Sequence, residues 1–199
     1  MKDFLRDLKV PLFIFDLSVF LLSLGDKKPD VQFLAIDIDD GLIKTANEKM
    51  EEGEKNDRTK TNVTFKALDI MNPDDAGDKF VAYLENFNAQ KFHIMFCFSI
   101  TMWIHLNHGD EGLKRFFQTA RKWCDYLVLE PQPWKCYRNA SRRMRRSHEP
   151  DFEHIESIEH KSDKLLPFII AQCEKVGFLN IYNFGETSWK RPILLFQAI

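Results

Sequence analysis

The sequence lacks the features expected of a secreted or membrane-spanning protein. Its 199 residues contain no C-x-x-C pair, and the four cysteines are widely spaced, which favours buried free thiols in a reducing compartment over a disulfide framework. No stretch approaches the roughly 20 uninterrupted apolar residues of a membrane-spanning helix. The apolar residues 10–24 include Asp16 and follow no basic leader with a small-residue cleavage site, which argues against a signal peptide. We therefore expect a cytoplasmic protein that contacts no membrane.

A large net charge is also absent, so the total charge neither favours nor excludes a nucleic-acid partner. The 28 basic and 30 acidic side chains give a formal net charge of -2. Their distribution is uneven, because no acid lies between Pro131 and His148. Six cations fall within twelve residues of this basic segment: Lys135, Arg138, Arg142, Arg143, Arg145 and Arg146.

On a helix, the basic segment would separate a charged face from one that packs inward. Arg138, Arg142 and Arg145 would share the charged face, while Tyr137 and Ala140 would lie on the other. Such a stripe of cations suits RNA phosphates. A solvated helix face is the alternative.

Linkers and repeats are absent as well, since no low-complexity tract or stretch rich in proline, glycine or serine divides the chain. Hydrophobic residues make up 44% of the sequence, with 18 Phe, which is ample for one core. We expect residues 1–199 to form a single domain. Short apolar runs alternate with amphipathic ones, as in βαβ units on a mostly parallel sheet. The expected strands are 31–37, 62–68, 91–98 and 125–130, and the expected helices are 40–51, 74–87, 109–123 and 162–176.

The C-terminal residues have a different pattern. Two extended runs, 178–184 and 192–198, are joined by a short polar connection, which predicts an antiparallel hairpin. A mostly parallel α/β sheet that ends in such a hairpin is the layout of the S-adenosylmethionine-dependent methyltransferase fold, a Rossmann-like architecture. This likeness is one of architecture alone.

Acidic residues end two neighbouring strands of the expected sheet. Ligands of open α/β sheets bind just past the carboxyl ends of the strands, so Asp37 could accept hydrogen bonds from both hydroxyls of a ribose. Asp69 could meet an adenine amino group while Ile70 packs on the ring. The alternative for the first acid is that it or a neighbour caps the next helix, for which Asp39 or Asp40 is better placed.

Another strand end carries Glu130, two prolines and an aromatic residue. Pro131 and Pro133 have no backbone donor and fix their own φ, so they end the strand abruptly and stiffen the turn after it. An acid in such a turn predicts a binding site.

Residues 99–107 join the strand expected at 91–98 to a helix, and they concentrate aromatic and histidine side chains where a small polar loop is usual. Trp103 could stack on a base and His105 could bind a phosphate. The alternative is an aromatic plug with a hydrogen-bonded histidine. We expect no metal at His105 and His108, because no further ligands with zinc-like spacing lie nearby.

Residues 97–113 and 127–138 resemble the two signature blocks of the bicoid-interacting-protein-three family of RNA 5'-phosphate methyltransferases, and residues 187–191 also fit. The similarity extends over residues 31–198. It implies an enzyme that transfers a methyl group from S-adenosylmethionine to an RNA 5'-phosphate. Met102 stands where the branch that caps a γ-phosphate has lysine. In this the chain resembles the branch that methylates a 5'-monophosphate, which implies a cytoplasmic enzyme acting on small RNA: histidine transfer RNA, with microRNA precursors as a further candidate substrate.

The resemblance also implies roles for individual residues. The implied cofactor-binding residues are Asp37, Ile38, Asp69, Ile70 and Phe98. The implied residues at the RNA end are Trp103, His105, Lys135 and Arg138, to which the basic segment adds Arg142. No catalytic residue and no metal ligand is assigned, and we expect a monomer.

The chain departs from the family near its N-terminus. Where members have a glycine-rich turn of the Gly-Cys-Asn-x-Gly kind, this chain reads Leu12-Phe13-Ile14-Phe15, and phenylalanine does not adopt the positive φ of glycine cheaply. The family's N-terminal segment with an arginine and aromatics is missing. We therefore expect a domain that is truncated in its N-terminal part and lacks an intact first loop. A second hypothesis is a catalytically impaired RNA-binding or regulatory protein of this fold, and a third is a γ-phosphate capping methyltransferase.

Overall fold

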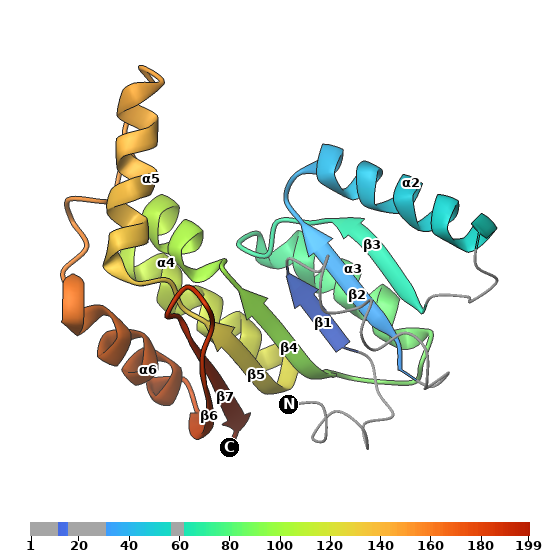
Figure 1. The fold of residues 1–199 in the computed structure, drawn as a ribbon. Helices are drawn as coiled ribbons and strands as arrows, with labels where there is room; N and C mark the ends of the chain where they lie inside the picture. Colours follow the sequence, from blue (N-terminus) through green and yellow to red (C-terminus); the bar gives the residue numbers. More distant parts are fainter. Residues whose placement is uncertain (1–11, 16–30, 57–61) are drawn as a thin grey trace. The chain divides into compact units, whose positions relative to one another are not determined.

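The computed structural model describes residues 12–15, 31–56 and 62–199, which fall into two compact units (Figure 1). The first unit ends at Phe96 and the second begins at Cys97. Strand β4 (Phe92–Phe98) continues from the first unit into the second.

The first unit contains a parallel sheet. Its strand β2 (Phe33–Asp37) pairs with β1 (Leu12–Phe15) and with β3 (Val63–Ala67), parallel in both cases. Helix α2 (Asp40–Asn56) follows β2, and α3 (Pro73–Glu85) follows β3. The predicted strands and helices of this region are confirmed to within a few residues, except that α2 extends five residues further than predicted.

Strand β1 was not among the predicted elements. It is formed by the four residues that stand in place of the family's glycine-rich turn, and they are extended and paired from Leu12 to Ile14 with β2. The sequence also lacks the N-terminal arginine and aromatics that the resemblance leads one to expect, but residues 1–11 lie outside the described residues. The same is true of residues 16–19.

Local sequence explains where α3 begins and how it packs. The side chain of Asn72 accepts a hydrogen bond from the backbone N–H of Asp75 at 3.3 Å, and Pro73 occupies the first helical position, where its missing donor costs nothing. Phe80 of this helix is fully buried and packs edge-to-face on Phe92, with ring centroids 5.2 Å apart.

The strands of the second unit form the predicted antiparallel hairpin. β7 (Pro192–Ala198) lies between β5 (Cys124–Glu130) and β6 (Phe178–Glu186) and is antiparallel to both. The α/β fold class with a parallel sheet and a C-terminal hairpin is therefore confirmed.

The helices of the second unit are α4 (Thr101–Trp123), α5 (Trp134–Arg146), the 3-10 helix η2 (Ser162–Lys164) and α6 (Leu165–Lys175). As the two prolines predicted, β5 stops at Glu130, and Pro133 immediately precedes α5 with a φ of -70°. In Figure 1, α5 projects from the rest of this unit.

The prediction that residues 99–107 form a loop was wrong. Helix α4 begins at Thr101, eight residues before the predicted helix, and Gly109 lies inside it at a kink with a φ of 66°. Glycine reaches this backbone conformation without a steric penalty. A side chain there would also come within 3.2 Å of the imidazole of His154. Trp103 and His105 therefore belong to the first turns of a helix.

All four cysteines are free thiols; Cys97, Cys124 and Cys173 are buried as expected, whereas Cys136 is half-buried. None of the helices in the described part of the chain is long and apolar enough to cross a lipid bilayer. Among the described residues, no three histidine, cysteine or acidic side chains come together in a group that could hold a metal ion.

Candidate functional site

Two carboxylates lie at one edge of the first unit's sheet. Asp37 is the last residue of β2 and pairs with Ala67 of β3, and its carbonyl accepts a hydrogen bond from the backbone N–H of Leu68 at 2.8 Å. Asp69 follows one residue later. Because the two strands are parallel, their carboxyl ends meet at the same edge, so both acids lie there as predicted.

Each of these carboxylates has one oxygen that is bonded to the backbone and one that has no partner in the described part of the chain. One oxygen of Asp37 accepts from the backbone N–H of Asp39 at 2.9 Å, and one oxygen of Asp69 accepts from that of Met71 at 2.8 Å. The second oxygen of each has no partner among the described residues. A half-buried carboxylate held in this way can accept hydrogen bonds from a hydroxyl or an amino group.

The competing role for Asp37 as a helix cap falls to Asp39. The side chain of Asp39 accepts hydrogen bonds from the backbone N–H groups of Gly41 at 2.8 Å and Leu42 at 3.2 Å, which caps the first turn of α2.

The two isoleucines predicted to contact a cofactor differ in exposure. Ile38 is 71% exposed, whereas Ile70 is 4% exposed and belongs to the core.

In the second unit, the ends of β4, β5 and β7 meet in a polar network in which Glu130 and Gln132 are buried and Ser99 and Arg191 are half-buried. Glu130 accepts a hydrogen bond from the hydroxyl of Ser99 at 2.7 Å, and Arg191 donates to that hydroxyl at 2.6 Å while lying 3.4 Å from the Glu130 carboxylate. The amide of Gln132 donates to the Ser99 carbonyl at 2.6 Å and accepts from the Met102 N–H at 3.3 Å. We call Ser99, Glu130, Gln132 and Arg191 the strand-end network.

Features of this network are typical of a functional site. Ser99 has a φ of 58°, a strained conformation for a residue with a side chain, and such residues cluster at functional sites. The Nε of Arg191 and the hydroxyl of Thr101 are buried without a hydrogen-bond partner among the described residues. Unsatisfied buried polar groups are rare enough in proteins to need an explanation such as a ligand.

Exposed aromatic and cationic side chains lie near the network. Trp189 is 72% exposed, with the guanidinium of Arg191 5.5 Å from its ring centroid. Trp103 is 40% exposed, and its ring centroid lies 6.0 Å from that of Phe152 and 6.0 Å from the Arg143 guanidinium. These indole rings can stack on a base.

The other predicted RNA-side residues lie on α5. Lys135, Arg138 and Arg142 are exposed on this helix, while Tyr137 and Ala140 are buried against the unit, as the periodicity of the basic segment predicted. Phe98, a predicted cofactor contact, is half-buried at the end of β4.

His105 does not present a nitrogen to a phosphate. It is fully buried, with Nε2 2.5 Å from a carboxylate oxygen of Asp110 and Nδ1 3.2 Å from the hydroxyl of Tyr137. Burial is the main cause that lowers the pKa of His105, and the nearby His154 and His160 also lower it, so the ring is neutral at neutral pH although Asp110 acts in the opposite direction. A carboxylate only accepts hydrogen bonds, so Nε2 carries the proton and Nδ1 accepts from Tyr137. His105 therefore fits the alternative given for residues 99–107, an aromatic plug with a hydrogen-bonded histidine, and not the phosphate-binding role.

The His105 cluster, consisting of His105, Asp110 and Tyr137, ties α4 to α5. A second oxygen of Asp110 accepts the backbone N–H of Glu159 at 3.2 Å, and the His105 ring stacks on Phe168 of α6 at 5.9 Å. Burial raises the pKa of Tyr137, so its hydroxyl remains a donor. The cluster therefore fixes the base of α5 on the unit.

Replacing Asp110 with asparagine is expected to lower the free energy of unfolding by about 1 to 2 kcal/mol, because His105 would lose a charged acceptor while keeping a neutral one. Urea unfolding measures this change. Asp163→Asn, which alters an exposed acid of the same unit, is the control and should leave the midpoint unchanged. Equal midpoints for the two variants would show that the cluster does not stabilise the unit.

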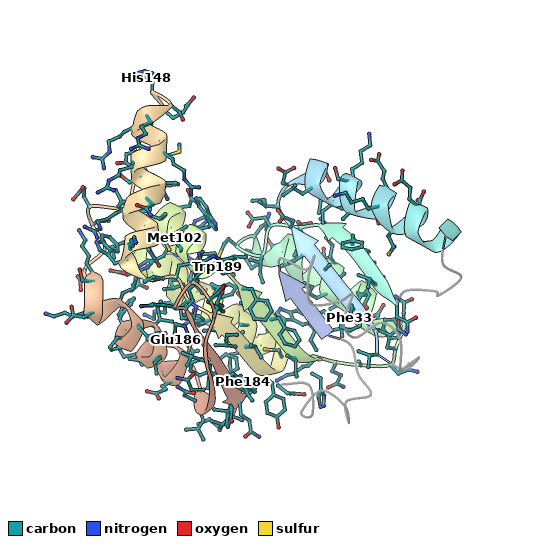
Figure 2. The ribbon with its side chains drawn as sticks, in the orientation of Figure 1. Phe33, Met102, His148, Phe184, Glu186 and Trp189 are labelled. Carbon is teal, nitrogen blue, oxygen red and sulfur yellow. The ribbon has the colours of Figure 1, made fainter. Side chains whose placement is uncertain are left out.

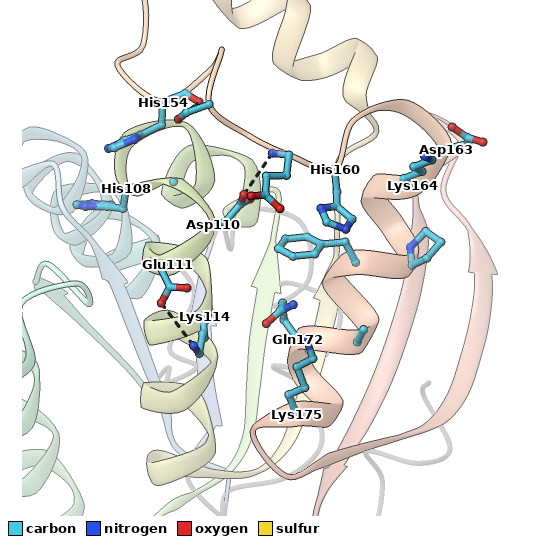
Figure 3. Close-up of a pocket in the computed structure, with 16 residues that line it drawn as sticks. His108, Asp110, Glu111, Lys114, His154, His160, Asp163, Lys164, Gln172 and Lys175 are labelled. Carbon is cyan, nitrogen blue, oxygen red and sulfur yellow. Dashed lines mark hydrogen bonds and ion pairs between the residues drawn. The ribbon is translucent and has the colours of Figure 1, made fainter.

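An open groove of about 1050 Å³ lies between α4, α6 and the segment 154–164 (Figure 3). None of the residues predicted to bind cofactor or RNA lines it. Its three lysines face four carboxylates, so its charge does not select an anionic ligand. The lining charges are Lys114, Lys164 and Lys175, with Asp110, Glu111, Glu159 and Asp163.

Sequence reasoning assigned no role to Gln132, Asp110 or Arg191. The partners of Arg191 and Gln132 lie far away along the chain, since Arg191 and Ser99 are separated by 92 positions and Gln132 and Ser99 by 33. Asp110 lies only five positions from His105, but the burial of that histidine is not visible in the sequence. The signal available for Gln132 and Asp110 was their position inside the two signature blocks, residues 127–138 and 97–113.

The fold is that of the methyltransferases. A solved structure of magnesium protoporphyrin IX methyltransferase from Synechocystis with bound S-adenosylmethionine has a TM-score of 0.56 with 15% sequence identity, over 96% of this chain and 70% of that chain. At this identity the likeness concerns the fold alone.

Sequence comparison assigns the family. The family model described as Bicoid-interacting protein 3 matches residues 92–198. The RNA 5'-monophosphate methyltransferase of Pongo abelii is 41% identical over 193 residues, which cover 92% of this chain and 64% of the relative. The pre-miRNA 5'-monophosphate methyltransferase of Danio rerio is 32% identical over 192 residues, which cover 96% of this chain and 72% of the relative. The chain belongs to the bicoid-interacting protein 3 family, and it spans less than two thirds of the length of the Pongo abelii relative.

Proposed function

We propose that the protein is a methyltransferase that uses S-adenosylmethionine to methylate the 5'-monophosphate of a small RNA, such as histidine transfer RNA or a microRNA precursor, as a cytoplasmic monomer. The observation that supports this most is the position of α5. The helix starts four residues after Glu130 of the strand-end network and carries exposed cations along its length. The polar strand-end network therefore lies beside a cationic helix surface that suits RNA phosphates, as expected for a member of this family.

The residues of the first unit fit the cofactor. Asp37 has a carboxylate oxygen without a partner among the described residues, which would accept the ribose hydroxyls, and the corresponding oxygen of Asp69 would accept the adenine amino group. Both acids are half-buried at one sheet edge, where nucleotide-type cofactors bind in open α/β folds. When bound, S-adenosylmethionine supplies a methyl group on a sulfonium, which is the electrophile.

The acceptor needs no strong base. A phosphate monoester has a second pKa of about 6 and is largely dianionic at neutral pH. The nucleophile therefore arrives deprotonated, and the protein's task is alignment, which can supply effective molarities of about 10⁵ M or more. The neutral His105 with both nitrogens engaged is consistent with a reaction that uses no histidine base.

Cations at the site bind a phosphate but also lower its nucleophilicity. Arg191 avoids part of this conflict, because Glu130 balances its charge at 3.4 Å. It can then hold groups by hydrogen bonds without adding net positive charge. Met102 is buried, with 3% of its surface exposed, so the position that is lysine in the capping branch adds no cation.

Transfer of a labelled methyl group to three matched RNAs tests the proposal. The RNAs end in a 5'-hydroxyl, a 5'-monophosphate or a 5'-triphosphate, and we expect label only on the monophosphate. A preference for the triphosphate would favour the γ-phosphate capping alternative. Failure of every RNA to accept label, together with no calorimetric heat from S-adenosylmethionine and retained RNA binding, would favour a non-catalytic RNA-binding protein.

A further inference from the structure

Four exposed cations of α5 form a straight stripe along its outer side. Lys135, Arg138, Arg142 and Arg146 follow one another at spacings of three, four and four residues, which places them within an arc of about 80° on a helix. All four are exposed, and none forms an ion pair with another described residue. We call these four residues the basic stripe.

The inward side of α5 fixes where the basic stripe points. Tyr137, Ala140 and Ser141 are buried, and they lie about 150° around the helix from the centre of the stripe. The stripe therefore faces away from the packed surface of the second unit.

The other two arginines of the helix are engaged elsewhere. Arg145 lies 3.8 Å from the carboxylate of Asp151, and Arg143 lies over the ring of Trp103. The charged face predicted from the sequence contained Arg145. Arg145 is exposed on the same side of the helix as Arg138, but it is left out of the basic stripe because it pairs with Asp151.

Nearby acids leave the basic stripe unneutralised. Asp151 accepts hydrogen bonds from the hydroxyl of Ser141 at 2.6 Å and from the backbone N–H of Phe152 at 2.9 Å, and the Ser141 hydrogen bond chiefly lowers its pKa. Glu149 and Glu153 are exposed close to the end of α5, yet neither pairs with the stripe in the described part of the chain. On a helix face that is only solvated, acids four residues from the cations could form stabilising i, i+4 ion pairs, and the basic stripe has none among the described residues.

The basic stripe begins at the strand-end network and leads outward. Cys136, next to Lys135, lies 3.9 Å from a guanidinium nitrogen of Arg191. From there α5 projects away from the rest of the second unit to its far end beside His148 (Figure 2). The first and last cations of the stripe are eleven positions apart, a distance of about 16 Å at 1.5 Å per residue.

We propose that the basic stripe binds backbone phosphates of the RNA beyond its 5' end, so that the substrate is an RNA strand several nucleotides long and a 5'-mononucleotide or dinucleotide is a poor one. The inference rests on the proposed function for the identity of the 5' end. Contacts of this kind fix position without reading sequence, so the stripe selects for strand length and not for base identity.

Binding of two 5'-phosphorylated RNAs by the full chain tests the inference. One is a strand long enough to reach Arg146, and the other is a dinucleotide. We expect wild-type protein to bind the long strand more tightly and Arg142→Gln/Arg146→Gln to lose about tenfold in affinity for it. Loss of two phosphate contacts should also reduce the slope of log K against log salt by about 1.4 for a single strand. Glutamine has a helix propensity close to that of arginine, so α5 should persist.

Two further variants separate this role from general damage. Arg115→Gln/Lys175→Gln removes the same charge from exposed positions of α4 and α6 and should keep the wild-type salt slope. Arg142→Lys/Arg146→Lys should retain most of the binding, since lysine also binds phosphate as a point charge. Equal affinity of wild type for both RNAs, or an unchanged salt slope in the glutamine variant, would overturn the inference. Because binding is the readout, these outcomes remain distinct from a failure of methyl transfer.

Discussion

Replacing Glu130 with alanine is expected to lower the free energy of unfolding by about 3 to 5 kcal/mol, because removal of one partner leaves the other charge of a buried pair uncompensated. The side chain of Glu130 is 6% exposed, and that of Arg191 is 19% exposed. Ser99 would lose its acceptor at the same time. Urea unfolding followed by tryptophan fluorescence and circular dichroism measures the change.

Matched variants show whether the effect belongs to the pair. Glu153→Ala removes an exposed glutamate of the same unit and should change stability by no more than about 0.5 kcal/mol. Glu130→Gln keeps an acceptor for Ser99 but loses the charge, so it should fall between wild type and Glu130→Ala. In a double-mutant cycle, Glu130→Ala and Arg191→Ala should cost less together than the sum of the single changes. Strict additivity would mean that the two residues are not coupled.

Local periodicity was sufficient to predict most elements of the fold. Leu113, Phe116 and Phe117 of α4 are fully buried, as their helical spacing indicated, and the hairpin of β6 and β7 follows from two apolar runs around a short polar connection. The start of α4 was missed because Trp103 and His105 suggested a ligand-binding loop. Their neighbours Met102 and Leu106 are buried at helical spacing, so the helical periodicity is present in the same residues whose composition is typical of a binding loop.

The candidate site was predictable where it depends on one strand end and was not where it depends on distant contacts. Asp37 could be found because an acid after an apolar strand is a local pattern. Arg191 could not, since its partner Ser99 lies 92 positions away. His105 was assigned to phosphate because residue type does not reveal burial, and its environment comes from Tyr137 and Phe168 on two other helices.

Replacing Asp37 with alanine is expected to weaken S-adenosylmethionine binding by about a hundredfold. The carboxylate would accept hydrogen bonds from the ribose hydroxyls, and each hydrogen bond to a charged group contributes about 1.5 to 3 kcal/mol. A total loss of about 3 kcal/mol corresponds to a hundredfold loss of affinity. Isothermal titration calorimetry of wild type and variant with the cofactor measures the change. The same experiment shows whether this chain, with strand β1 in place of a glycine-rich turn, binds the cofactor.

Asp39 provides the control for this prediction, since it lies two residues away and has a different task. Asp39→Ala removes the side chain that caps α2 through Gly41 and Leu42, which should cost about 1 kcal/mol of stability and leave cofactor affinity near that of wild type. A loss of affinity in Asp39→Ala equal to that in Asp37→Ala would indicate that both changes act through the turn between β2 and α2. Wild-type affinity in Asp37→Ala would exclude the ribose contact, because the assignment depends on that carboxylate accepting the ribose hydroxyls.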